Sequence, residues 1–324
     1  MVMSWQPLTG VEMAPDLQVA AADAPVLAEL LALLLLALAL LAAPPLGAAT
    51  TVQRSVSAGP TGRVDVHLFD GSVRIEAWER AEVQVVASFE RAADQLELKS
   101  SGSAVSIEIS SRNPGRSRAN LVVQVPRASN LYIEVLSAAV EVKGLVGDLE
   151  VEAVNGSIVI AGGPRRVEAQ SVSGSIELES TGSESLELET VSGSLRAVAV
   201  AARVTANTVA GPMRLRLSGL ESGKFETVSG RIEAVIVPEQ HARVELQSFS
   251  GSTRLEVPAK LSARYQLEST TGRMRVELPG ARRQEAGRDA DDDRVTFEQG
   301  SGDAAFRLET FSGEIEVRPI ADPS

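Results

Sequence analysis

The sequence contains no cysteine and only two histidines among its 324 residues. Disulfides, thiolate nucleophiles and Cys/His zinc sites are therefore excluded by composition alone. The absence of thiols is compatible with either an oxidising or a reducing compartment, so it does not fix the location. His67 in VDVHLF and His241 in PEQHAR lie in no catalytic motif, and the sequence predicts both as ordinary surface or strand-end residues.

Basic and aromatic residues are also scarce. Lys and Arg number 31 against 43 Asp and Glu, and the net charge of -12 has the wrong sign for binding nucleic acid or anionic lipid head groups. Aromatic residues make up 3 % of the chain, which weakens a sugar-binding role. Of the few present after residue 50, Trp78 is the only tryptophan, and Tyr132 and Tyr265 are predicted at core or turn positions.

Motifs of nucleophilic or phosphate chemistry are missing too. The sequence has no G-x-S-x-G elbow and no P-loop. Carboxylates are plentiful, but Glu177, Glu187 and Glu189 alternate with apolar residues, a pattern typical of the wet face of a strand. The chain is predicted not to be an enzyme and to use no cofactor and no metal. A carbohydrate-active enzyme built on stacked strands is the least favoured alternative.

One long apolar run stands near the start, VLAELLALLLLALALLAA at residues 26–43. Its core is shorter than the roughly 20 apolar residues that span a bilayer and fits the length of a secretory signal. Small residues follow Pro44 and Pro45, which favours cleavage just before Thr50, although no Lys or Arg precedes Arg54. Residues 1–49 are therefore predicted as a signal peptide, and an uncleaved N-terminal membrane anchor stays open as the alternative.

Beyond this run the sequence repeats. A small pair, usually Ser-Gly, precedes an alternating stretch such as VSGSIEL, VSGSLRA or VSGRIEA, and successive copies lie 18 to 21 residues apart except for one step of 41. A degraded copy, LSAAVEV, has Ala138 in place of the glycine. The glycines of the eight clear copies are Gly156, Gly174, Gly193, Gly211, Gly230, Gly251, Gly272 and Gly313.

Each repeat alternates apolar and polar residues with period two. Ile176 and Leu178 alternate with glutamates, and so do Leu186 and Leu188. This pattern predicts two short strands per repeat, separated by Gly/Ser turns. The fold class is predicted as all-β, a β-solenoid of about nine coils with a period near twenty residues. The recurring glycines would be its structural corners, small because each stacks on its own copies. A β-sandwich or meander is the alternative.

The repeats divide the chain into regions. Residues 51–135 are predicted as an irregular N-terminal β region that caps the stack, and residues 136–318 as the Ser-Gly strand repeats. The final segment, FSGEIEVRPIADPS, is expected at the other end, where Pro319 removes a ladder donor. Residues 279–294 are predicted as a polar acidic insertion in a solvated loop; Asp289, Asp291, Asp292 and Asp293 lack the spacing of a Ca²⁺-binding loop.

The order of these segments resembles a known family. FDGSVRIEAWERAEVQVVA, then LVVQVPRASNLYIEVLSAAVEVKGLVGDLEVEAVNGSIVI, then the VSGSIEL copies are similar to the bacterial putative-adhesin family of exported β-strand-repeat proteins. The likeness covers most of residues 60–318, and the domain of that family has no assigned function. The resemblance implies an exported, envelope-associated β-solenoid and carries no catalytic residues.

Together these observations predict a non-enzymatic, exported interaction or structural module of the bacterial envelope, in the periplasm or at the cell surface. The expected partner is an envelope or extracellular protein or polymer of unknown identity. Contact with the membrane is expected only through residues 26–43, if they stay uncleaved. The alternative is a membrane-anchored sensory or regulatory module with the repeats outside the cytoplasm.

Overall fold

The computed structural model describes residues 50–90, 94–111, 118–284 and 294–321. These residues form 21 β-strands and contain no helix, so the all-β prediction is confirmed. The predicted leader, residues 1–49, lies outside the described residues. Within the described ranges no helix is long and apolar enough to span a bilayer.

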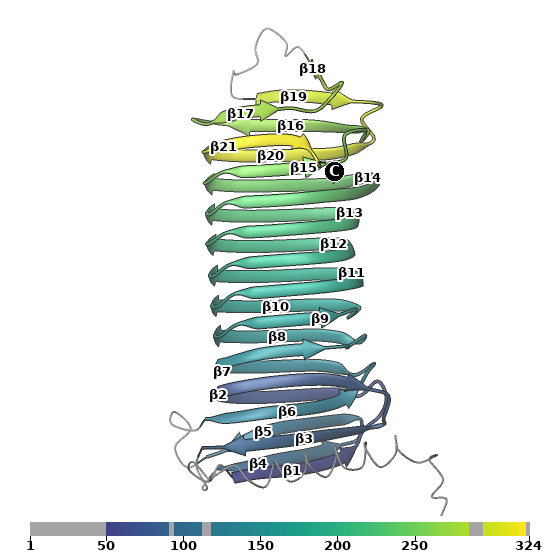
Figure 1. Cartoon of the computed structure of the whole chain (residues 1–324), viewed down its shortest axis with the longest axis vertical. Helices are drawn as coiled ribbons and strands as arrows, with labels where there is room; N and C mark the ends of the chain where they lie inside the picture. Colours follow the sequence, from purple (N-terminus) through teal and green to yellow (C-terminus); the bar gives the residue numbers. More distant parts are fainter. Residues whose placement is uncertain (1–49, 91–93, 112–117, 285–293, 322–324) are drawn as a thin grey trace, which may run out of the picture. The chain divides into compact units, whose positions relative to one another are not determined.

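In the central part of the chain, successive repeats pair with one another in parallel (Figure 1). Ile176 is the partner of Leu195, and Leu195 is the partner of Met213 one repeat further on. A meander joins neighbouring strands in antiparallel pairs, so the parallel register means that the chain completes one turn per repeat. The strands of this stack are β8 (Asp148–Asn155), β9 (Ile158–Gly162), β10 (Arg166–Ser173), β11 (Ile176–Ser192), β12 (Leu195–Ala210), β13 (Met213–Ser229), β14 (Ile232–Ser250) and β15 (Thr253–Val257).

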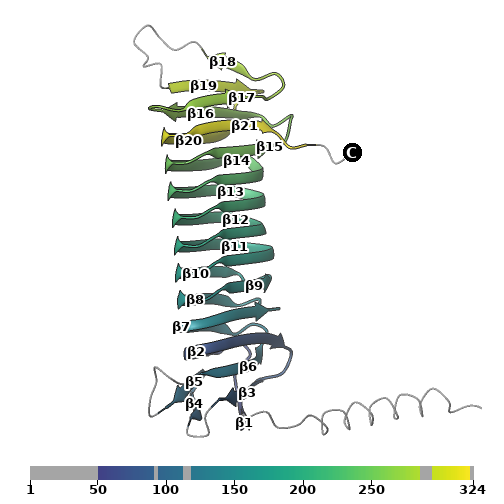
Figure 2. The same ribbon diagram turned by 60° about the vertical axis from the view of Figure 1, so that its left-hand side comes forward.

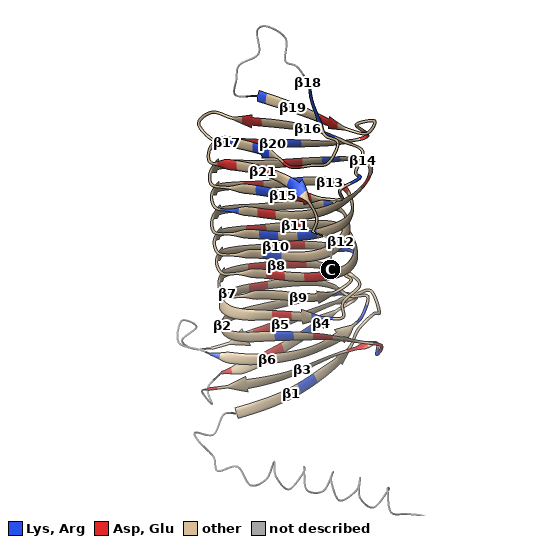
Figure 3. Ribbon diagram, turned by 45° about the horizontal axis from the view of Figure 1, so that its top comes forward, with Lys and Arg blue, Asp and Glu red and all other residues tan. Residues whose placement is uncertain are grey.

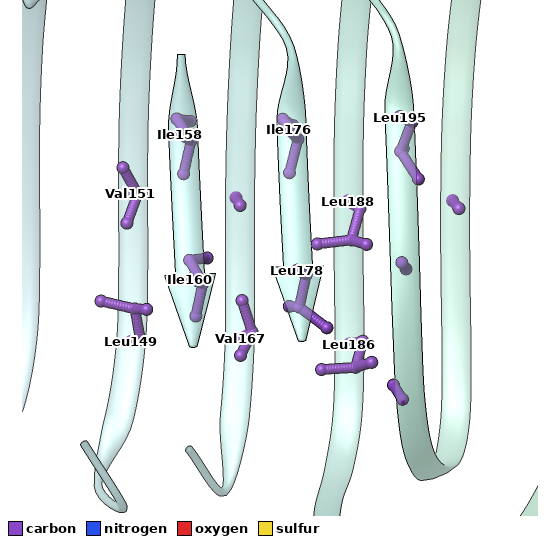
Figure 4. Close-up of a cluster of buried hydrophobic side chains, with 14 of the residues drawn as sticks. Leu149, Val151, Ile158, Ile160, Val167, Ile176, Leu178, Leu186, Leu188 and Leu195 are labelled. Carbon is purple, nitrogen blue, oxygen red and sulfur yellow. The ribbon is translucent and has the colours of Figure 1, made fainter. Parts of the chain in front are cut away.

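Each turn of the stack has two strand segments with a buried row on each. In β11 the two segments meet where the register shifts between Ser180 and Ser183. Leu178 of the first segment and Leu188 of the second are fully buried, and Figure 4 shows both in one apolar cluster. Because side chains alternate along a strand, the neighbours of each buried leucine in these segments, such as Glu177, Glu179, Glu187 and Glu189, face outward. The core therefore runs through the stack as superposed layers of Leu, Ile, Val and Ala.

The N-terminal part of the described chain enters the same stack out of sequence order. Strand β2 (Arg63–Trp78) pairs in parallel with β7 (Asn130–Lys143) on one side. On its other side β2 pairs in parallel with β5 (Ala104–Ser110) and β6 (Ala119–Pro126). The prediction that the repeat phase is lost throughout residues 51–135 is therefore wrong for β2, whose Gly71 pairs with Ala138.

Antiparallel strands close that end. Strand β3 (Glu82–Phe89) pairs antiparallel with β6 and with β1 (Thr50–Ser57), and β4 (Gln95–Ser101) pairs antiparallel with β5. These strands interrupt the repeating parallel edge that an open stack would otherwise offer to another chain.

The C-terminal strands are also intercalated. Strands β20 (Ala304–Ser312) and β21 (Glu314–Pro319) lie between β14/β15 and β16 (Ala263–Ser269) with β17 (Arg273–Val276), as Figure 2 shows. The prediction that the segment ending in Pro319 forms the end of the stack is wrong. The end is made instead by β19 (Arg294–Gln299), which pairs antiparallel with β16, and by β18 (Arg282–Gln284) beyond it.

The predicted polar insertion, residues 279–294, is a loop only in part. Arg282–Gln284 form β18, and Arg294 begins β19, although both were expected in a solvated loop because of their charge. Antiparallel pairing at the edge of the sheet leaves these side chains exposed, which is why the charged residues are tolerated there. The acidic residues of the insertion, 289 and 291–293, lie outside the described residues.

Candidate functional site

The eight predicted corner glycines stack on one another in a single column. A Cβ placed on Gly193 would fall far inside van der Waals distance of the Gly174 carbonyl oxygen, and the same relation repeats up the column. Glycine is therefore needed in this column because the backbones of successive coils approach closely. Three of these glycines, Gly156, Gly211 and Gly313, also have a positive φ angle. In spatial order the column is Gly156, Gly174, Gly193, Gly211, Gly230, Gly251, Gly313 and Gly272.

The column has members that sequence reasoning missed. Gly71 takes the corner position in β2, with φ of 130°, between Ala119 and Ala138. The signal was present, because FDGSVRI has the same arrangement of Gly, Ser and alternating apolar residues as VSGSIEL. Alanine is tolerated in two of these levels, so the column demands a small residue and not always glycine.

A groove of about 1350 Å³ runs along the stack beside this column. We call it the corner groove. In nine coils, from that of β2 to that of β20, it is lined by the residues four, three and two positions before the corner residue, as in Glu189, Thr190 and Val191 before Gly193. The corner groove therefore consists of three parallel rows: a polar row, a floor and an exposed apolar row.

The polar row alternates acids with amides. In spatial order it reads Glu152, Gln170, Glu189, Asn207, Glu226, Gln247, Glu309, each the registered partner of the next. Like charges directly opposite each other on adjacent strands are destabilising, and an amide between two carboxylates avoids that contact. Asn207 acts in this way, because its Nδ2 donates to Glu189 Oε1 at 2.8 Å.

The polar row continues at the N-terminal end with Glu134, His67 and Glu108. His67 Nδ1 lies 3.0 Å from Glu134 Oε2, so this histidine is a surface residue in a carboxylate-rich row. His241 lies elsewhere, exposed, with φ of 67°. The hydrogen-bond partner of His67 is thus a carboxylate rather than a hydroxyl nucleophile. No group of three or more His, Asp or Glu in the described ranges could hold a metal ion.

The exposed apolar row forms the opposite rim. Its nine side chains are 39 to 59 % exposed, although each is Val, Leu or Phe. Phe249 and Phe311 stack with ring centroids 5.0 Å apart and an interplanar angle of 2°. A contiguous exposed apolar strip of this kind marks an interaction surface more often than chance. The row consists of Phe69, Leu136, Val154, Val172, Val191, Val209, Val228, Phe249 and Phe311.

The floor between the two rims carries buried hydroxyl groups. Thr190 Oγ1 donates to the Gly174 carbonyl at 3.1 Å, which ties this hydroxyl to the corner of the preceding coil. The other hydroxyls of the floor have no hydrogen-bond partner among the described residues. These residues are Ser171, Thr208, Thr227, Ser248 and Thr310.

The charged side chains that line the corner groove are almost all acidic. Its lining includes six glutamates and no Lys or Arg. Three of the glutamates have cationic neighbours just outside the groove: Lys224 Nζ lies 2.9 Å from Glu226, Lys99 Nζ lies 3.7 Å from Glu108, and Arg307 contacts Glu309. Glu152 and Glu189 have no such ion pair in the described part of the chain. Net negative charge therefore concentrates at the middle of the groove.

The predicted aromatic positions do not supply stacking platforms in the corner groove. Tyr265 is fully buried and stacks on Phe306 at 5.2 Å, as a core residue. Tyr132 lies under the guanidinium of Arg63 at 5.3 Å. Trp78 Nε1 donates to the Glu82 carbonyl at 2.8 Å and lies outside the groove lining.

Solved structures that are similar to this chain include two putative adhesins and a putative lipid binding protein. A putative adhesin from Parabacteroides merdae is 8 % identical, with 84 % of this chain and 97 % of that chain covered and a TM-score of 0.43. A putative adhesin from Bacteroides fragilis is 11 % identical over 84 % and 98 % of the two chains, with a TM-score of 0.40. A putative lipid binding protein from Parabacteroides distasonis is 13 % identical over 85 % and 98 %, with a TM-score of 0.41.

Curated proteins gave no significant match to this sequence. The family comparison did: the profile described as Toastrack DUF4097 matches residues 63–318, which is most of the chain and nearly all of the strand stack from β2 to β21. The resemblance to the adhesin-like repeat family is thereby confirmed, and the chain belongs to the Toastrack DUF4097 family.

Proposed function

We propose that this chain is a non-enzymatic, adhesin-like binding module, a solenoid of about nine coils that holds an extended partner along the corner groove. The observation that carries the proposal is the groove itself, in which successive coils repeat a polar, a floor and an apolar position beside the glycine column, with a hydroxyl on the floor from β10 onward. A partner that is long and repetitive can make the same contact at every coil. Weak contacts made together give avidity without any single strong site.

The absence of a catalytic motif supports the non-enzymatic part of the proposal. Apart from the neighbouring Glu134 and Glu152, the carboxylates of the polar row are separated by an amide or by His67, and they are spread along the stack rather than converging on one point. Glycoside hydrolysis requires two carboxyl groups facing each other across one scissile bond. We expect a bound polymer to be recovered without cleavage.

Binding through the groove is tested with a matched pair of variants. The full-length protein is applied to arrays of peptides and polysaccharides. Val191→Arg/Val228→Arg places two bulky cations on the groove rim, and Val198→Arg/Val237→Arg places them on exposed valines outside the groove lining. We expect the groove variant to bind its ligands at least tenfold more weakly than the wild type does. The control variant should bind them as tightly as the wild type. Equal binding by both variants, or cleavage of the ligand, contradicts the proposal.

Export is part of the proposed function and has its own test. We propose that residues 1–49 are removed and that the strand stack acts in the periplasm or at the cell surface. N-terminal sequencing of the protein fractionated from its own cells should give a mature terminus near Thr50. An intact terminus in the membrane fraction would instead support the anchored sensory module.

A further inference from the structure

The spacing of charge in the corner groove specifies the shape of its partner. Carboxylates recur at every second coil, at Glu152, Glu189 and Glu226, with an amide in each intervening coil. Adjacent strands of a sheet lie about 4.7–4.9 Å apart, so these carboxylates repeat every ~9.6 Å along the stack. A partner with cations at the same interval on one face would meet all of them.

Among extended or helical peptides, one regular conformation has this interval. A polyproline II helix has three residues per turn and rises about 3.1 Å per residue, so every third side chain returns to the same face after ~9.3 Å. In a β-strand, same-face side chains recur every two residues, about 6.6 Å apart. In an α-helix they recur after seven residues, about 10.5 Å apart, an error of nearly 1 Å at every step.

The remaining rows of the groove suit the same conformation. A polyproline II helix has no internal hydrogen bonds, so its backbone groups are free to bond to a partner. The polar row offers the amide side chains of Gln170, Asn207 and Gln247 as hydrogen-bonding groups. The exposed valines and the stacked pair Phe249 and Phe311 offer an apolar rim for proline rings.

We propose that the corner groove binds a proline-rich basic segment in the polyproline II conformation, with Lys or Arg at every third residue. This inference rests on the proposed function and names its ligand class. The lysines would lie over Glu152, Glu189 and Glu226, and the intervening prolines against the valine rim. About 15 residues would cover a groove of nine or ten coils, since both lengths are close to 45 Å.

The first test compares two peptides of the same composition on the full-length protein. One is (Pro-Pro-Lys) repeated five times; the other has five lysines and ten prolines, with the lysines alternately two and four residues apart. We expect fluorescence anisotropy to show at least tenfold tighter binding of the regular peptide, with affinity falling as salt increases. Equal binding of the two peptides, or none of either, overturns the inference.

Substitutions in the polar row test the charge spacing from the protein side. Glu152→Gln/Glu189→Gln removes two carboxylates that have no ion pair in the described part of the chain. Glu179→Gln/Glu221→Gln removes two exposed carboxylates outside the groove and serves as the control. We expect the groove variant to bind the regular peptide at least tenfold more weakly and the control to bind it within twofold of the wild type.

A third variant keeps the net charge and changes only its position. Glu189→Gln/Asn207→Asp reverses the donor and acceptor of the 2.8 Å hydrogen bond between these side chains and moves one carboxylate by one coil. We expect affinity for the regular peptide to fall at least fivefold, and the thermal midpoint to fall slightly, because the new carboxylate at position 207 lies opposite Glu226. Unchanged affinity means that charge alone matters and overturns the inference.

These experiments separate failure of the inference from failure of the proposed function. If Val191→Arg/Val228→Arg abolishes binding of array ligands but regular and irregular peptides bind equally, the groove binds and the polyproline II assignment is wrong. If sedimentation shows that the wild type dimerises and the Val→Arg variant does not, the groove is occupied by a second copy of the chain, which also overturns the inference.

Discussion

Arg254 and Glu316 are 62 residues apart in the sequence and form an ion pair on adjacent parallel strands, with Nε 2.7 Å from Oε2. The pair joins β15 to the intercalated strand β21. Arg318 and Glu256 form a second pair at 2.8 Å between the same two strands. Figure 3 shows basic and acidic residues on successive strands of this region.

These pairs give a physical reason for the intercalation. If β15 stacked directly on β17, Arg254 would face Arg275, and Glu256 would face Glu277 in the next outward position. Like charges directly opposite each other on neighbouring strands are destabilising. Strand β21 separates them, since Glu316 is the registered partner of both Arg254 and Arg275. Electrostatics therefore favours the observed strand order over the sequential one.

The strand order can be tested by cross-linking, because the chain has no natural cysteine. Arg254→Cys/Glu316→Cys places the two thiols on adjacent strands with Cα atoms about 4.8 Å apart, within the range for a disulfide. We expect this pair to oxidise readily, as seen by a mobility shift on non-reducing gels.

The control for the cross-link is Arg254→Cys/Arg275→Cys. These positions lie on either side of Glu316, about 9.6 Å apart, beyond the roughly 7 Å that a disulfide can bridge. Oxidation of the control pair in preference to the first pair would mean that the repeats stack in sequence order and that β21 lies elsewhere.

Substitutions of Glu316 measure how much its contact with the neighbouring arginines contributes to the stability of the fold. The Glu316 side chain is 16 % exposed, and Glu316→Gln should lower the free energy of unfolding by about 0.5–1 kcal/mol, discounted for the partly exposed arginine. Glu316→Arg should cost about 1 kcal/mol more, because three arginines would then be stacked. Denaturant unfolding measures both. Glu314→Arg, an exposed neighbour on β21, should change little, and an equal loss there would refute the electrostatic explanation.

The sequence predicted the repeat, the alternation and the corner column, because each is a local pattern. VSGSIEL shows its buried face and its small residue without any knowledge of the neighbouring coil. The order of the coils is different. The step of 41 before Gly313 does not indicate that Gly313 lies between Gly251 and Gly272 in space. The spatial order of the coils is indicated by complementary charges on strands that become neighbours, such as Arg254 and Glu316. Recognising them requires comparing positions that are far apart in the sequence.

The sequence predicts the rows of residues that line the corner groove but not the groove itself. Alternation places Val191 and Glu189 on the outer side of the strand, and the repeat places copies of both at every coil. Their enclosure of a groove depends on how the strand bends into the glycine corner, which is set by backbone geometry. Gly71 was missed because residues 51–135 were treated as out of phase, although β2 lies in register with β7.

The stability of the stack should depend on pH through Glu316. Hydrogen bonding to Arg254 holds the pKa of the Glu316 carboxyl below its ordinary value of 4.5, although burial opposes the effect. A carboxyl with a lowered pKa in the folded state stabilises the fold above pH 4.5, and this contribution disappears as pH falls through the folded pKa. The difference in unfolding free energy between wild type and Glu316→Gln should therefore shrink between pH 7 and pH 3. A difference that stays constant would contradict this linkage.

The glycine column gives the sharpest structural prediction, because β11 contains Gly182, which lies outside the column, and is followed directly by Gly193, which belongs to it. A methyl group on Gly193 would overlap the Gly174 carbonyl oxygen, whereas one on Gly182 would meet no atom within 4 Å. Gly193→Ala should therefore lower the unfolding free energy by about 1–3 kcal/mol or more, through forced separation of the coils. Gly182→Ala should be neutral or slightly stabilising, because alanine reduces the entropy of the unfolded chain. Thermal unfolding of the two variants measures the difference. If both alanines cost the same, the recurring glycines serve chain flexibility rather than close stacking, and the physical basis of the repeat would have to be sought in the turns.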